Sequence, residues 1–116
     1  MNKLLISAAL APLILLAPAP ADAATTTLKA TVGPEMTITL TKGGKSVHKL
    51  RHGDYVIKVA DKSNMHNFHL EGPGVNKKTS VPKTGNVTWK VTLKKGQYRF
   101  VCDAHTASMK GSFKVS

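Results

Sequence analysis

Apolar and polar residues alternate with a period of two along most of the chain after residue 25. This alternation is typical of strands that bury one face and expose the other, and the segments are rich in the Thr, Val, Ile and aromatic residues that favour strands. Turn signals containing glycine and proline separate them. We predict strands at 26–32, 36–41, 55–59, 86–93, 98–102 and 112–115. The pattern predicts an all-β fold, a Greek-key β-sandwich of seven to eight strands.

Two segments, Leu50–Val59 and Leu93–Cys102, share the pattern L-x-x-G-x-Y-x-(I/F)-x-(V/C). We interpret each glycine as a corner that leads into a strand and each tyrosine as a tether for that corner through its hydroxyl. The alternation then places Tyr98, Phe100 and Cys102 on one inner face. The second segment has a cysteine where the first has a valine, so the thiol is predicted to point inward at the end of a strand.

The first residues have the features of a secretory signal peptide. Lys3 supplies a positive charge, residues 4–17 are almost wholly apolar, and Ala21-Asp22-Ala23 is a small-x-small cleavage site. Prolines interrupt the apolar run, and it is too short for a transmembrane segment. We predict that residues 1–23 are removed and that residues 24–116 form one small domain, exported to the periplasm or the extracellular space.

The chain is strongly basic, with 17 Lys and Arg against 6 Asp and Glu and a formal net charge of +11. The cations are dispersed and mostly alternate with apolar residues, as on the solvated outer faces of strands. The excess favours acidic proteins, or anionic membrane surfaces, as partners. Export and the small number of aromatic side chains argue against nucleic acid.

Cys102 is the only cysteine in the sequence, so it cannot form an internal disulfide. An odd cysteine in an exported protein forms an interchain bridge, stays a free thiol or binds a metal, and a metal would also stabilise so small a core. His105 and Met109 follow on the loop that leaves the same strand. A turn can bring these three side chains onto one ion.

A fourth ligand must come from elsewhere, and the segment 64–70 offers His66 and His69. Three positions apart in an extended segment, they face opposite sides, so only one can readily join Cys102. His48 and His52 are interpreted as turn or surface residues. A thiolate, two imidazoles and a thioether favour copper, because zinc prefers four firm ligands and a thioether is a poor one.

The C-terminal stretch resembles the cupredoxins, the plastocyanin-like blue copper proteins. The resemblance covers about residues 50–115, and the residues that carry it are Gly96, Tyr98, Phe100, Cys102, His105, Met109, Gly111 and Phe113, together with His66 and Asn67 upstream. It implies a copper site with His66, Cys102 and His105 as ligands and Met109 as the axial thioether. It also implies that Asn67 holds the two ligand loops together.

Two features depart from the family pattern. Many members have a proline between the cysteine and the histidine, whereas this chain has Asp103-Ala104. The gap of three residues between His105 and Met109 lies between the amicyanin-like and plastocyanin-like lengths. Met36 and Met65 are alternative thioethers. These departures leave the axial bond and the reduction potential open.

We expect an exported, monomeric protein that binds one copper ion, Cu(I) or Cu(II), and carries single electrons to an acidic redox partner. A copper-delivery protein of the same fold is the alternative, and the cluster of Met65, His66 and His69 is compatible with it. A metal-free basic surface-binding sandwich and a copper-dependent dismutase are further alternatives; the dismutase would need more converging histidines. The sequence shows no acid–base pair beside the site, so we do not expect an enzyme.

Overall fold

The structure is a computed structural model, and it describes residue 12 and residues 25–116. The predicted signal peptide and its cleavage site lie outside the described residues, apart from residue 12. Within the described part of the chain, no helix is long and apolar enough to cross a membrane.

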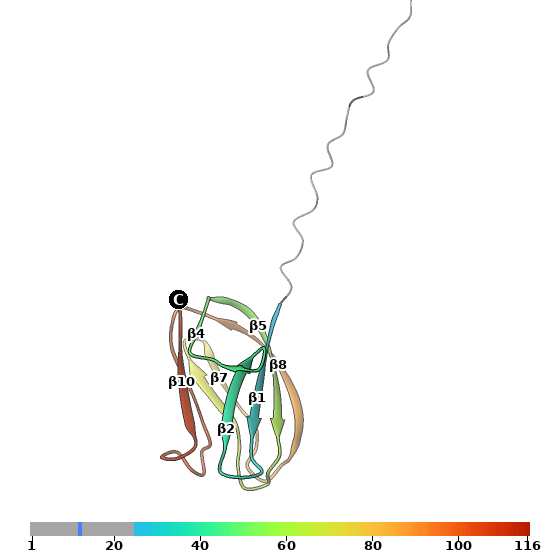
Figure 1. Cartoon of the computed structure of the whole chain (residues 1–116), viewed down its shortest axis with the longest axis vertical. Helices are drawn as coiled ribbons and strands as arrows, with labels where there is room; N and C mark the ends of the chain where they lie inside the picture. The colour runs from blue at the N-terminus through green and yellow to red at the C-terminus, as the bar shows by residue number, and fades with distance from the viewer. Residues whose placement is uncertain (1–11, 13–24) are drawn as a thin grey trace, which may run out of the picture.

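In residues 25–116, ten strands form two five-stranded sheets that pack face to face (Figure 1). The order in the first sheet is β3-β2-β1-β5-β8, and in the second it is β4-β10-β9-β6-β7. The first sheet contains β1 (Thr26–Val32), β2 (Ile38–Lys42), β3 (Lys45–Ser46), β5 (Gly53–Asp61) and β8 (Gly85–Leu93). The second contains β4 (Lys49–Leu50), β6 (His69–Gly72), β7 (Val75–Lys78), β9 (Gly96–Val101) and β10 (Lys110–Val115).

The prediction of an all-β sandwich is confirmed. All six predicted strands form, and each of their ends lies within two residues of the predicted position. Four strands were not predicted: the two-residue strands β3 and β4, and the hairpin of β6 and β7. The hairpin lacks a clear alternation, because His69 and Leu70 are both buried and the outer strand β7 buries only Val75. Eight strands have four or more residues, as expected.

The core lies between the sheets and is lined by the inward positions of the alternating strands. Leu28, Ile57 and Phe68 are fully buried in it. The rings of Tyr98 and Phe113 stack at 5.3 Å between centroids, a separation at which aromatic pairs add to the stabilisation from burial. The predicted inward face is confirmed, since Cys102 is also fully buried.

The loops gather at two ends of the sandwich. The connections β1–β2, β5–β6, β7–β8 and β9–β10 lie at one end, here named the cysteine-loop end. Thr25 and Ser116 lie at the other, here named the entry end. The two short turns β6–β7 and β8–β9 are also at the entry end.

Both tyrosine tethers are confirmed, and both lie at the entry end. The Tyr55 hydroxyl donates to the backbone oxygen of Arg51 at 2.7 Å. The Tyr98 hydroxyl donates to the oxygen of Pro73 at 2.6 Å and accepts from the backbone nitrogen of Lys94 at 3.0 Å. The pKa of Tyr55 is raised by burial, despite the nearby Arg51. A neutral hydroxyl therefore fixes this corner.

Candidate metal centre

The loop between β9 and β10 is closed by its own backbone. Cys102 donates its N–H to the oxygen of Met109 at 3.0 Å, and its own oxygen accepts from the N–H of His105 at 3.0 Å. The N–H of Met109 donates to the oxygen of His105 at 2.9 Å. These bonds hold three potential ligands on one compact turn, as the sequence spacing predicted. Cys102 and Met109 are buried, and His105 is half-buried.

The loop between β5 and β6 brings His66 against this turn. Its Nδ1 lies 3.2 Å from Nδ1 of His105, and each of these nitrogens lies 3.8 Å from the Cys102 sulfur. His66 is 3% exposed. The donor atoms of two imidazoles and one thiol therefore point at one another. They come from two loops, and 36 positions separate His66 from Cys102 along the chain.

The triangle of donor atoms suits a single metal ion. Metal–nitrogen bonds of about 2.0–2.1 Å and a metal–sulfur bond of about 2.3 Å, arranged in a plane at 120°, give nitrogen–nitrogen and nitrogen–sulfur separations of about 3.6 and 3.8 Å. The observed separations are 3.2 and 3.8 Å. The donor set, one thiol with two imidazoles, is soft enough for copper in either oxidation state.

The candidate thioethers differ sharply in burial. Met109 is 1% exposed and belongs to the same turn as Cys102 and His105, whereas Met36 and Met65 are 51% and 65% exposed. Met109 is thus the methionine that the fold buries beside the donor triangle.

His69 lies apart from the donor triangle. It begins β6, and its Nδ1 lies 2.8 Å from a carboxylate oxygen of Asp103, while its Nε2 lies 2.6 Å from Asn76 Oδ1 and 3.0 Å from Glu71 Oε1. His66, by contrast, lies in the loop before the strand. Of the two histidines in the segment, His66 alone reaches Cys102 among the contacts of residues 25–116.

His48 and His52 are exposed, as expected. His52 lies at the entry end, where its Nδ1 is 3.0 Å from the backbone oxygen of Ser116.

Asn67 joins the two loops, and this expectation is confirmed. Its backbone N–H points at the Cys102 sulfur at 3.4 Å. Its amide donates to a carboxylate oxygen of Asp103 at 2.7 Å, and its amide oxygen accepts from the backbone N–H of Asp103 at 2.7 Å. The same amide donates to the oxygen of Thr79 at 3.1 Å. A buried side chain with this many partners fixes the position of the cysteine loop.

Asp103 is one of the two residues between Cys102 and His105, where this chain lacks the proline of the family pattern, and its carboxylate contacts the other ligand loop and β6. One oxygen accepts from Asn67 and the other faces His69. Burial alone would raise the pKa of Asp103, but hydrogen bonds from His69 and Asn67 outweigh it and hold that pKa below its ordinary value of 3.8. The loop that lacks proline is therefore braced by a charged hydrogen-bond network.

The pKa of His69 is raised, whereas that of its partner Asp103 is lowered. Burial alone would lower the pKa of His69, yet its bonds with Asp103 and Asn76, and the charges of Asp103 and Glu71, raise that pKa above the ordinary 6.5. Each partner thus favours the charged form of the other.

Thr79 supports the loop of His66 from the β7–β8 side. Its hydroxyl accepts from the N–H of Phe68 at 2.9 Å and donates to a carboxylate oxygen of Asp61 at 3.0 Å. Asp61 also accepts from the N–H of Ser63 at 3.2 Å. Sequence reasoning missed Thr79 and Asp61, because neither belongs to a recognisable motif.

Gly33 was also missed. Its φ of +70° is a left-handed conformation that favours glycine. A Cβ there would lie 2.7 Å from Cβ of Ser63 and 3.4 Å from Cδ2 of His66. Gly33 and Pro34 form one of the glycine and proline turn signals of the sequence, but nothing in that signal indicates that Gly33 lies close to His66. Gly111 has a different reason for being glycine, since the ring of Phe100 occupies the space of a Cβ there.

The fold matches those of known copper proteins. The structure of the copper protein rusticyanin covers 79% of this chain and 78% of its own, with 13% identity and a TM-score of 0.60. Reduced auracyanin from Roseiflexus castenholzii covers 79% and 98%, with 20% identity and a TM-score of 0.56. A chain of a heme-copper terminal oxidase dimer covers 78% and 63%, with 21% identity and a TM-score of 0.54.

No family model matches the chain, and no curated protein sequence matches it. The structural matches together with the sandwich topology show that the chain has the cupredoxin fold. The grouped His66, Cys102 and His105 lie where two loops meet at one end of that fold.

Proposed function

We propose that the protein is an exported type 1 copper protein that binds one copper ion and carries single electrons between redox proteins, without being an enzyme. The observation that carries the proposal is the triangle of His66 Nδ1, Cys102 Sγ and His105 Nδ1. Met109, buried on the same turn, is the proposed weak axial ligand.

Bound copper would supply one-electron chemistry through Cu(I) and Cu(II). The chain's contribution is to hold its ligands still. Asn67 and Asp103 lock the two ligand loops together, and the N–H of Asn67 is directed at the thiol sulfur. Ligands fixed in this way need little rearrangement when the charge at the site changes. The half-buried His105 is the proposed exit for the electron.

Visible absorption after addition of Cu(II) tests the proposal. A thiolate bound to Cu(II) gives an intense charge-transfer band, so the protein should turn blue or green, and Cys102→Ala should stay colourless. His66→Ala should lose stoichiometric copper, whereas the matched variant His69→Ala should retain it. A wild-type protein that binds Cu(II) without an intense visible band would contradict the type 1 assignment.

Copper delivery is the second candidate function, and the exposure of Met65 favours it. This thioether is 65% exposed and directly precedes the buried His66, so it could receive Cu(I) from, or pass it to, another protein. Transfer of Cu(I) to a chelator should then slow in Met65→Leu. An electron carrier without a delivery role would show equal transfer from wild type and variant.

The proposed redox partner is acidic, and the formal net charge of +11 supports this. Opposite charges raise association rates by roughly 10–10³-fold, and added salt screens them over about 8 Å at physiological ionic strength. Electron transfer with such a partner should therefore slow steeply as salt rises. Lys110→Glu, beside the cysteine loop, should slow it more than Lys58→Glu on the outer face of β5. A rate independent of salt would show that docking is apolar.

A further inference from the structure

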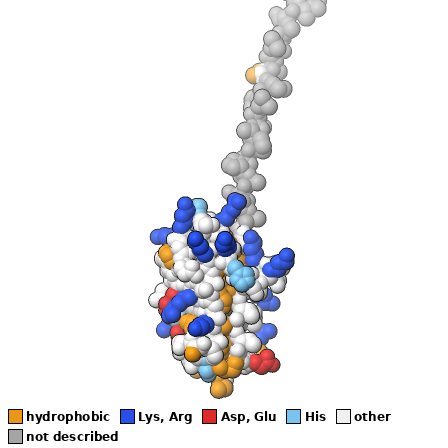
Figure 2. Space-filling model, turned by 60° about the vertical axis from the view of Figure 1, so that its left-hand side comes forward, with side chains coloured by type: hydrophobic (Ala, Val, Ile, Leu, Met, Phe, Trp, Pro, Cys, Tyr) orange, Lys and Arg blue, Asp and Glu red, His pale blue; other side chains and the backbone are white. Residues whose placement is uncertain are grey.

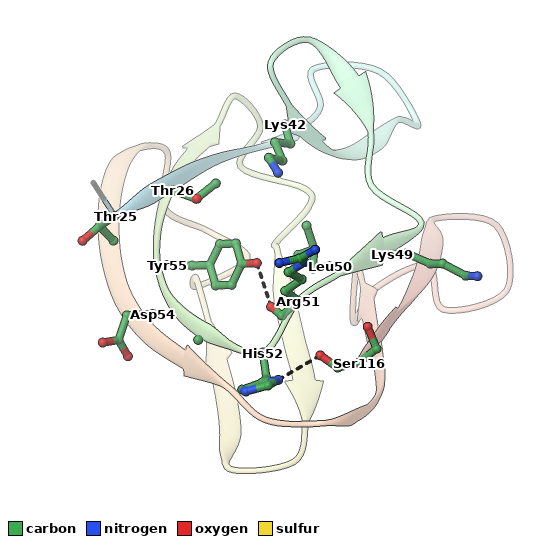
Figure 3. Close-up of a pocket in the computed structure, with 11 residues that line it drawn as sticks. Thr25, Thr26, Lys42, Lys49, Leu50, Arg51, His52, Asp54, Tyr55 and Ser116 are labelled. Atoms are coloured by element: carbon green, nitrogen blue, oxygen red, sulfur yellow. Dashed lines mark hydrogen bonds between the residues drawn. The ribbon is translucent and has the colours of Figure 1, made fainter. Parts of the chain in front are cut away.

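The entry end carries a pocket that the proposed copper function does not use. It has a volume of about 630 Å³ and lies between the start of β1, the end of β2 and the loop that joins β4 to β5 (Figure 3). Lys42, Lys49, Arg51 and His52 line it, and Asp54 is the one acidic side chain among its lining residues.

The basic loop of this pocket is held in place by hydrogen bonds to its neighbours. Ser116 donates its N–H to the oxygen of Leu50 at 2.9 Å, and the N–H of His52 donates to the oxygen of Ser116 at 2.8 Å. The Tyr55 hydroxyl donates a hydrogen bond to the backbone oxygen of Arg51. The cations therefore project from a fixed backbone, which lowers the entropy lost when they bind a ligand.

Lys42 and Arg51 extend toward the middle of the pocket in Figure 3, while Lys49 and Asp54 point outward. His52 lies beside them, and its Nδ1 donates to the backbone oxygen of Ser116 at 3.0 Å.

The cationic side chains of the pocket are not paired with acidic side chains. None of the ion pairs among residues 25–116 includes Lys42, Lys49 or Arg51. Asp54 points away from Lys42 and Arg51 in Figure 3 and accepts from the Thr92 hydroxyl at 2.6 Å. Figure 2 shows lysine and arginine side chains gathered at this end of the domain, and hydrophobic side chains at the opposite tip.

The strand register adds to the repulsion. Lys42 faces Lys45 across β2 and β3, and Lys49 faces Lys114 across β4 and β10. Like charges opposite each other on paired strands are destabilising. An anion bound in the pocket beside Lys42 would offset part of that repulsion.

We propose that this pocket is a binding site for a phosphate group, either free phosphate or the headgroup of an anionic phospholipid. The planar guanidinium of Arg51 and the ammonium group of Lys42 suit the phosphate oxygens, and the pocket is wide enough for a headgroup. The proposal does not depend on copper.

The first experiment titrates the purified, isotopically labelled protein with inorganic phosphate at constant ionic strength, with chloride as the compensating salt. We expect saturable NMR shifts of the amides from Leu50 to Gly53 and of Ser116. The pocket variant K42Q/R51Q should weaken binding at least about tenfold, since bonds to charged groups are strong. The control K29Q/K58Q removes two charges from a facing lysine pair that does not line the pocket.

The second experiment measures co-sedimentation with phosphatidylglycerol vesicles, with phosphatidylcholine vesicles as the uncharged reference. Phosphate shifts without vesicle binding support the site with free phosphate as its ligand. Vesicle binding that the pocket variant loses and the control keeps supports it with the headgroup as its ligand. The proposal is overturned if neither probe binds, or if both variants weaken binding equally, because the effect would then be one of net charge.

Discussion

The two ends of the sandwich are stabilised in different ways. At the cysteine-loop end, the buried side chains of Asn67 and His69 bond to the more exposed carboxylate of Asp103, and Asn67 also bonds to the backbone of Thr79. At the entry end, backbone groups and two tyrosine hydroxyls close the corners, and the charged side chains point into solvent or into an open pocket.

The difference shows where this fold depends on particular side chains. A buried polar group left without a partner costs free energy, whereas an exposed one is rescued by water. Substitutions that remove one polar partner should therefore act strongly at the cysteine-loop end and weakly at the entry end. Matched pairs of variants can test this contrast.

The largest effect is expected for Asn67→Ala against Thr92→Val. Asn67 is 2% exposed, and its loss leaves the N–H of Asp103 without its acceptor, so unfolding free energy should fall by about 2–4 kcal/mol. Thr92→Val removes one exposed hydrogen bond to Asp54 and should change it by less than about 0.5 kcal/mol. Urea unfolding of the metal-free protein measures both. Equal losses of unfolding free energy in the two variants would contradict the proposed difference between the two ends.

A smaller effect separates Gly33→Ala from Gly43→Ala. Both glycines have left-handed φ values, +70° and +56°, so both variants incur about 1–2 kcal/mol of backbone strain. Only at Gly33 would the new Cβ crowd Ser63; at Gly43 nothing lies within 4 Å. Gly33→Ala should lower the unfolding free energy by about 1–3 kcal/mol more than Gly43→Ala. The same urea experiments measure this difference in unfolding free energy. Equal unfolding free energies for the two variants would show that the loop containing Ser63 and His66 moves to accommodate the new Cβ at no cost.

The smallest effect is a pH dependence confined to the cysteine-loop end. Because folding raises the pKa of His69, its charged ring stabilises the folded protein. That contribution to the unfolding free energy is complete below pH 6.5 and is lost as pH rises through the folded-state pKa of His69. The lowered pKa of Asp103 means that its stabilisation is present above pH 3.8 and is lost as pH falls through its own folded-state pKa. The pair is therefore most stabilising between these values.

Unfolding free energies of the wild type and His69→Gln, measured from pH 4 to 9, test this. The gap between them should be widest near pH 5–6 and shrink toward pH 9. It should stay below about 1 kcal/mol, because the Asp103 side chain is 38% exposed and water screens the pair. The Glu71→Gln substitution removes the more distant carboxylate partner of His69. In that background the loss of unfolding free energy caused by His69→Gln should shrink less than it does in the Asp103→Asn background.

Much of the fold could be predicted because alternation is a local signal. The strands with a clean inward face, such as β1 and β5, were predicted at or near their observed bounds. The β6–β7 hairpin was not predicted, because β6 buries two consecutive residues and β7 is an outer strand with three exposed ones. The two-residue strands β3 and β4 are too short to show any period.

The candidate site divides in the same way. Cys102, His105 and Met109 lie within eight residues of sequence, so their spacing predicted one loop, which backbone hydrogen bonds close into a compact turn. Asp103 was noticed only as a departure from the family pattern, and its bonds to Asn67 and His69 could not be predicted from the sequence. Gly33 and Thr79 carry no chemical signal, and their roles depend on which loops happen to meet.

By itself, the sequence determined the sandwich, the inward cysteine and the local group of sulfur and imidazole donors, because these follow from the two-residue period of a strand and from spacing along one loop. The tertiary structure decided which histidine of the segment 64–70 faces Cys102, how Asp103 braces the site, and which lysines face one another around the pocket at the entry end. Those contacts join residues far apart in the chain, so they depend on the register and packing of two sheets, which no local pattern specifies.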